Sequence, residues 1–134
     1  MEISTDRDRI DRGLVHRFLS EESYWARSRT REESDRVIDA SLCFGAYDAD
    51  GRQVGHARVV TDTAAFAYLG DVFVVRAVRG RGVGTALMVA VLEHPAVRDV
   101  RRLALVTDDA HGLYERFGFR PLDDLRKWMQ RRPD

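Results

Sequence analysis

Three alternating glycines between two apolar runs restrict the fold of this chain more than any other sequence feature. The run Arg79-Gly80-Arg81-Gly82-Val83-Gly84 follows the β-rich residues 65–75, and residues 82–94 predict a helix that is apolar nearly all round. Glycines at the start of a helix let unpaired backbone N–H groups approach an anion closely. With the helix dipole and two arginines, this strand–loop–helix unit predicts a phosphate site.

Two common phosphate-binding motifs do not fit the spacing of this loop. The dinucleotide fingerprint G-x-G-x-x-G needs a third glycine where the chain has Thr85. A Walker P-loop counted from Gly80 also needs glycine at that position, and a lysine after it. The alternative without a ligand is a glycine-rich turn that only caps the helix.

The periodicity of the remaining chain predicts an α+β fold with a mixed sheet. Thr30 and Glu33 fit a capping box at the start of a second helix, and Asp48-Ala49-Asp50-Gly51 is typical of a hairpin turn. The expected helices cover residues 10–19, 30–38, 82–94 and 110–117. The expected strands cover residues 2–5, 42–47, 53–61, 65–75, 103–107 and 119–122.

Composition excludes several classes of function. Lys+Arg and Asp+Glu both total 22, and zero net charge argues against a non-specific nucleic-acid binder. The single cysteine, Cys43, excludes an internal disulfide and a cysteine-based zinc site, and four scattered histidines predict no metal. No apolar stretch approaches the roughly 20 residues of a membrane span. Residues 1–10 lack the apolar core of a signal peptide, so a cytoplasmic location and one domain over residues 1–134 are expected.

Two segments of the second half resemble the GNAT (N-acetyltransferase) superfamily. Asp71-Val72-Phe73-Val74 followed by Arg79-Gly80-Arg81-Gly82-Val83-Gly84-Thr85 is similar to that family's coenzyme A signature, whose core is Q/R-x-x-G-x-G/A. Ala110-His111-Gly112-Leu113-Tyr114-Glu115-Arg116-Phe117-Gly118-Phe119 resembles the family's block A-x-x-L-Y-x-x-x-G-F. The chain departs from the family at Thr107, where an asparagine is frequent.

The resemblance implies an acyl-CoA-dependent N-acyltransferase, with acetyl-CoA as donor and no metal. It implies a mixed, mostly antiparallel sheet of six or seven strands flanked by about four helices. A small-molecule or peptide amine would attack the thioester directly in a ternary complex. The residues that match the coenzyme-binding positions of the family are Phe73, Val74, Arg79, Gly80, Arg81, Gly82, Val83, Gly84 and Thr85.

The resemblance also implies a general acid and an acceptor pocket. Tyr114 matches the tyrosine that protonates the departing thiolate, and its alternative is an aromatic side chain packed on its helix. Asp71 is a candidate base and acceptor ligand, or else an aspartate with local hydrogen bonds; His111 and water are the other candidate bases. Tyr24 and Trp25 fall where the family builds its acceptor pocket, with core or lid packing as the alternative.

Two other functions fit the same fold. One is a non-catalytic acyl-CoA-binding or sensing module, against which an intact Tyr114 argues. The other is a toxin-type acetyltransferase that acts on aminoacyl-tRNA, against which zero net charge argues. The identity of the amine and the oligomeric state, including a homodimer, stay open.

Overall fold

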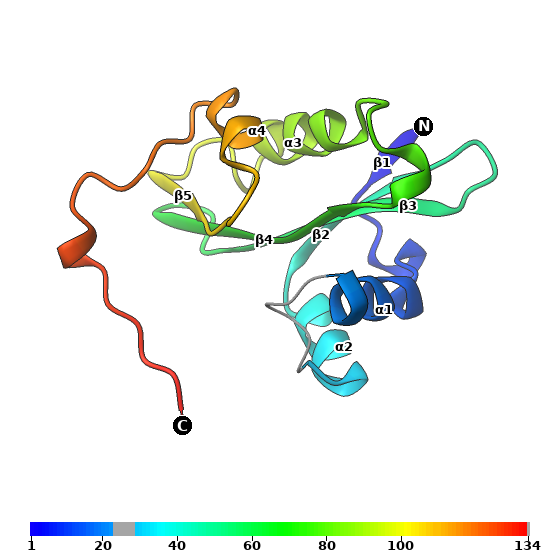
Figure 1. Ribbon diagram of the computed structural model, residues 1–134, viewed down its shortest axis with the longest axis horizontal. Coiled ribbons are helices and arrows are strands. Elements are labelled where there is room, and N and C mark those ends of the chain that lie inside the picture. Colours follow the sequence, from blue (N-terminus) through cyan, green and yellow to red (C-terminus); the bar gives the residue numbers. More distant parts are fainter. Residues whose placement is uncertain (23–28, 134) are drawn as a thin grey trace.

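A five-stranded mixed sheet divides the protein into two layers of helices (Figure 1). The computed structural model describes residues 1–22 and 29–133. The sheet has the order β1-β2-β3-β4-β5, antiparallel except for the parallel pair β4–β5. The strands are β1 (Glu2–Ser4), β2 (Leu42–Tyr47), β3 (Gln53–Thr61), β4 (Phe66–Val74) and β5 (Arg102–Leu105). The predicted mixed, mostly antiparallel α+β architecture is therefore confirmed.

The helices lie on opposite faces of the sheet according to their place in the chain. The first pair, α1 (Arg12–Glu22) and α2 (Arg31–Asp39), covers one face, and the later pair, α3 (Val83–Glu93) and α4 (His111–Glu115), covers the other (Figure 1). Short 3₁₀ turns are η1 (Arg7–Arg9), η3 (Arg76–Val78) and η4 (Leu125–Lys127). In the described residues, no helix is long and apolar enough to span a membrane.

The expectation of six or seven strands is wrong, because the described residues form five. The segment that fails to pair is residues 119–122, expected as a strand. It begins by closing α4, since the Phe119 N–H donates to the Tyr114 carbonyl at 3.2 Å. The Phe119 ring also packs edge-on against Tyr114, with centroids 5.8 Å apart. These local contacts direct the backbone away from the sheet.

The residues after Phe119 run outward without joining the sheet, interrupted by the turn η4 (Figure 1). The Trp128 ring lies under the guanidinium of Arg102, at 5.2 Å from the ring centroid. Leu125 and Met129 are exposed. This segment therefore adds little to the core.

Two local sequence signals act as predicted. The Thr30 hydroxyl accepts from the Glu33 N–H at 3.1 Å and caps α2. The Asp48 carboxylate accepts from the N–H groups of Asp50 and Arg52, which fixes the β2–β3 turn. Both contacts join residues close in sequence, so the pattern alone suffices to indicate them.

Each face of the sheet buries its own apolar cluster. The α3 face is centred on Leu87, Met88 and Val91, which are fully buried against the sheet. Gly55 allows this approach, since a Cβ there would lie 3.1 Å from Leu87 and Val83 side-chain atoms. The α1/α2 face buries Ile10, Val15, Leu19, Ile38, Cys43 and Phe73. Cys43 is thus a core residue, and its burial raises the pKa of the thiol to about 11.

Gln53, with the buried His56 beside it, ties the start of α1 to the sheet. Gln53 accepts from the Asp11 N–H at 2.8 Å and donates to the Gly55 carbonyl at 3.0 Å, and its amide lies 3.4 Å from His56 Nδ1. His56 Nε2 has no partner within the described part of the chain. Burial lowers the pKa of His56 to about 4, so the ring is neutral at pH 7.

This histidine should make the protein sensitive to mild acid. The folded-state pKa of His56 lies below its unfolded value near 6.5, so the unfolded state binds more protons between about pH 6.5 and 4. Stability therefore falls as the pH is lowered through this window, by about 2–3 kcal/mol. Urea unfolding at pH 7 and pH 4.5 should show this loss in the wild type and a smaller one in His56→Gln. The exposed His111→Gln variant is the control, and equal losses in all three proteins would contradict the prediction.

Candidate active site

The sheet opens where β4 outlasts its parallel neighbour. The pairing of β4 with β5 ends at Leu69 opposite Leu105, whereas β4 continues to Val74. On this side, residues 70–74 have no strand partner within the described residues. The backbone groups on this side, apart from the Val74 carbonyl that accepts from Arg79, are therefore available to an extended ligand, as a further strand would use them.

The loop after β4 presents the start of α3 to the same opening. Gly82 is the N-cap, with a left-handed φ of 82° and no side-chain cap. The first backbone bond of the helix runs from the Ala86 N–H to the Gly82 carbonyl at 3.0 Å. The amides of Val83, Gly84 and Thr85 precede that bond and belong to the unpaired first turn. These amides and the helix dipole favour an anion at this point.

A cavity of about 430 Å³ lies at the start of α3. Its lining includes seven of the nine residues predicted to bind the coenzyme: Val74, Arg79, Gly80, Gly82, Val83, Gly84 and Thr85. Phe73 and Arg81 are outside the lining; the Phe73 side chain is buried on the α1/α2 face, where it stacks on Phe18 at 4.2 Å. Sequence reasoning missed Val78, Leu113 and Arg116, which complete the lining.

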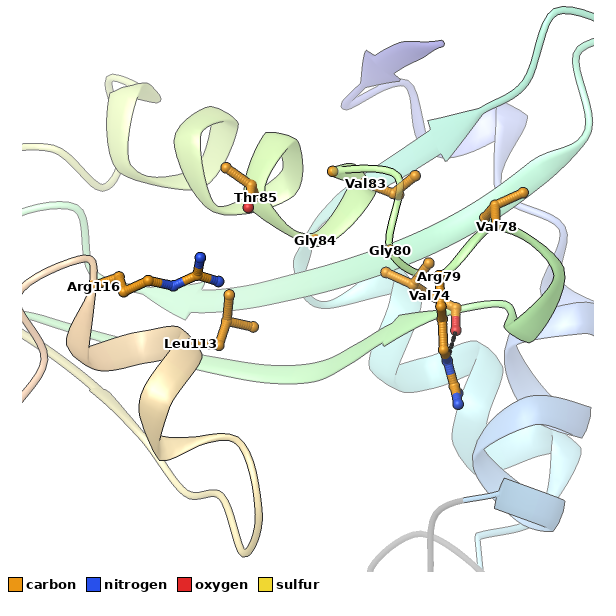
Figure 2. A pocket seen from close by; sticks show the side chains of 10 residues that line it. Val74, Val78, Arg79, Gly80, Val83, Gly84, Thr85, Leu113 and Arg116 are labelled. Carbon is orange, nitrogen blue, oxygen red and sulfur yellow. Dashed lines mark hydrogen bonds between the residues drawn. The ribbon is translucent and has the colours of Figure 1, made fainter.

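The arginine that faces this cavity differs from those expected. Figure 2 shows Arg116, at the end of α4, extending toward α3, and the Arg79 side chain directed away from the helix start. Arg79 Nε donates to the Val74 carbonyl at 3.0 Å, and its guanidinium lies 6.0 Å from the Phe18 ring centroid. Arg79 therefore holds the loop against β4, and Arg116 supplies positive charge to the cavity. The sequence signal that could have identified Arg116 was its position two residues after Tyr114.

Tyr114 lies on α4 beside the cavity-lining residues Leu113 and Arg116. The ring is buried in the core cluster of the α3 face. Burial, and then the charge of Asp109, raises the pKa of the phenol above its usual value of 10. The phenol is therefore protonated at neutral pH, as a general acid must be before it acts.

Asp71 lies at a β-bulge, where the pairing of β3 with β4 shifts between His56 and Arg58. Its φ is 52°, a left-handed value that costs a non-glycine residue about 1–2 kcal/mol. One carboxylate oxygen accepts from Arg29 Nη1 and from Arg58 Nε, both at 2.7 Å. Although burial alone would raise it, these two arginines lower the pKa of Asp71.

These contacts are unfavourable for the predicted role of Asp71 as a base. A carboxylate with a lowered pKa binds a proton weakly, and only 4% of this side chain is exposed to an acceptor. The next candidate, His111, is exposed at the start of α4, three residues before Tyr114.

Thr107 accepts from the Ala110 N–H at 3.1 Å and thereby supports the start of this helix. Tyr24 and Trp25, predicted to contact the acceptor, lie outside the described residues.

No group of three or more histidine, cysteine or acidic side chains in residues 1–22 and 29–133 is arranged to hold a metal ion.

The comparisons with known proteins agree with this geometry. Residues 13–119 match the model of the acetyltransferase (GNAT) family. A presumed acetyltransferase of this family from Xanthomonas campestris pv. campestris is 50% identical, with a TM-score of 0.95 over 98% of this chain and 92% of that one. No curated protein matches the chain.

More distant solved structures share the fold. A Staphylococcus aureus protein of unknown function, thought to be an acetyltransferase, is 23% identical with a TM-score of 0.75, over 98% of each chain. Glucosamine-6-phosphate N-acetyltransferase from Arabidopsis thaliana is 17% identical with a TM-score of 0.71, over 99% of this chain and 98% of that one. With a family match over most of its length, the chain belongs to the GNAT acetyltransferase family.

Gly84 provides a test of the loop as a coenzyme site. A Cβ at Gly84 would meet only Val74 Cγ2, at 3.9 Å, so Gly84→Ala should fold normally. The added methyl group projects at the helix start, where a phosphate must approach the backbone. We expect the Kd for acetyl-CoA, measured by calorimetry, to rise about tenfold or more.

Gly112→Ala is the matched control, because it also adds a methyl group to a helix, with nothing within 4 Å and away from the cavity lining. Equal Kd values for acetyl-CoA in Gly84→Ala and Gly112→Ala would show that the loop is not part of the coenzyme site.

Proposed function

We propose that the protein is an N-acyltransferase that transfers the acetyl group of acetyl-CoA to a primary amine. The observation that carries the proposal is the unpaired start of α3, which opens into a cavity beside the end of the β4–β5 pairing. A pyrophosphate fits the unpaired amides at the start of α3. An extended chain with amide groups fits the edge of β4 that lies beyond the β4–β5 pairing. Acetyl-CoA, the co-substrate of the family, combines both.

The coenzyme is proposed to lie with its pyrophosphate at the amides of Gly82, Val83, Gly84 and Thr85. Arg116 would add a charge-assisted contact from the C-terminal end of α4. The pantetheine would continue along β4 beyond Leu69, on the side where β5 no longer pairs with it. Phe73 and Val74 would contribute backbone rather than side-chain contacts. Arg81 is exposed and free to approach the outer phosphates.

The reaction is proposed to proceed by direct attack in a ternary complex. The amine nitrogen forms a bond to the thioester carbonyl carbon, and the carbon–sulfur bond breaks. The departing thiolate takes the phenolic proton of Tyr114, which the phenol carries at pH 7. The proton lost by the amine passes to water or to His111, since Asp71 is held by two arginines.

Tyr114→Phe separates acid catalysis from packing. The variant keeps the buried ring and its contact with Phe119 but has no proton to donate. With saturating acetyl-CoA, kcat for thiol release should fall about 10²–10⁴-fold. The Kd for acetyl-CoA should change little, because Tyr114 is outside the cavity lining. Full activity in this variant would reduce Tyr114 to a packing residue.

A screen of thiol release from acetyl-CoA against a panel of amines tests the function itself. Turnover with any amine, confirmed by mass of the acetylated product, supports the proposal. A protein that binds acetyl-CoA but turns over no amine would be the binding module instead. The cytoplasmic location and a homodimer stay predictions.

A further inference from the structure

The charges around Asp71 do not balance. Arg29 and Arg58 both donate to Asp71 Oδ2 at 2.7 Å, so two positive charges meet one negative charge. The exposed fractions of the Arg29 and Arg58 side chains are only 18% and 13%. Among the ion pairs of the described residues, neither arginine contacts a second carboxylate. One positive charge is therefore held largely out of water without a partner.

The two guanidinium groups also retain unused donors. A guanidinium has five N–H bonds, and the bonds found for the two are those of Arg29 Nη1 and Arg58 Nε to Asp71 and of Arg58 Nη1 to the Ser41 hydroxyl at 3.4 Å. In the described part of the chain, the buried side-chain polar atoms without a partner include no arginine nitrogen. The N–H groups of Arg29 and Arg58 that have no partner among the described residues are the donors that a ligand would use.

Stabilising the bulge at Asp71 leaves the charge of the second arginine without a balancing anion. One guanidinium suffices to neutralise a carboxylate, and a second partly buried positive charge costs desolvation energy that the first pair does not offset. An anion placed on the open side of the pair would balance the charge. The planar fork of arginine suits a carboxylate or a phosphate.

This cluster lies beside the opening between β4 and β5. Asp71 is two residues beyond Leu69, the last residue of β4 paired with β5. Val74, which lines the coenzyme cavity, follows three residues later, about 10 Å along the strand. Arg58 belongs to β3, and Arg29 immediately precedes the cap of α2. The arginines thus adjoin the α1/α2 face, opposite the face that carries α3 (Figure 1).

We propose that the acceptor is an amine that also carries an anionic group, and that Arg29 and Arg58 bind that anion. This inference rests on the proposed N-acyltransferase function and names its substrate class: amino acids or amines that bear a phosphate. Asp71 orients the two guanidinium groups at the bulge. The anion anchors the acceptor on the α1/α2 face, and its amine reaches the thioester through the opening beside β4.

Acceptors that differ only in charge test this substrate class. Three small acceptors place a primary amine two carbons from a second group. That group is a carboxylate in β-alanine, a phosphate in O-phosphoethanolamine and a neutral hydroxyl in ethanolamine. L-Amino acids and their amides extend the comparison to other side chains. The wild type should acetylate an anionic acceptor with a kcat/KM at least tenfold above its neutral counterpart. The β-alanine and O-phosphoethanolamine arms distinguish carboxylate from phosphate.

The variants Arg58→Gln and Arg29→Gln should remove this preference. KM for the anionic acceptor should rise about tenfold or more, with little change for the neutral one. A variant that is only less stable would lower both activities together, so the ratio of the two kcat/KM values isolates anion recognition. Comparing this ratio between wild type and variant also cancels the difference in amine pKa. Arg12→Gln is the matched control, since Arg12 pairs with Asp39 on the same face at 2.6 Å.

Four results overturn the inference. Equal turnover of anionic and neutral acceptors by the wild type, or a wild-type ratio in both arginine variants, contradicts it and leaves the N-acyltransferase function intact. Binding of acetyl-CoA without thiol release for any acceptor contradicts the proposed function, and the inference with it. If Arg12→Gln lost the preference for anionic acceptors as fully as Arg58→Gln, the effect would come from the overall positive charge of this face and not from the Asp71 cluster.

Discussion

Burial of α3 against the sheet is the packing contact on which both the core and the candidate coenzyme site depend. Leu87, Met88 and Val91 are fully buried, and Gly55 lets the helix approach β3 closely. Because the helix is fixed along its length, its first turn is fixed as well, and its free amides point into the cavity without a side-chain cap. A ligand at this point meets donors that are already oriented, so little ordering accompanies binding.

The bulge at Asp71 is the second constraint, and it is a local one. A left-handed φ at an aspartate persists only where surrounding contacts determine it, and here two arginines hold the carboxylate at 2.7 Å. The bulge follows the last β4–β5 pair and accompanies the divergence of the two strands. The same ion pairs that stabilise the bulge lower the pKa of Asp71 and favour a role in positioning over one in proton transfer.

Features determined by neighbouring residues were predictable from the sequence. The glycine loop, the cap at Thr30 and the turn at Asp48 depend on short-range contacts, and the structure contains all three. The Asp71 contacts come from residues 42 and 13 positions away, which no local pattern indicates. Residues 119–122 have the composition of a strand, but the return of Phe119 to Tyr114 decides their course. Arg116 belongs to a recognised block, but its direction depends on how α4 docks.

The separation of the two apolar clusters by the sheet has a consequence for how proteins of this shape change over time. Substitutions in contact are coupled, whereas distant ones without shared partners are nearly additive. The glycine loop leads into α3 on one face, and the arginine cluster adjoins α2 on the other, since Arg29 precedes its cap and Arg58 contacts Ser41. Changes that retune the acceptor side should therefore carry little penalty on the donor side. With the function proposed above, such modularity would allow the acceptor site to change while the acyl-donor site persists.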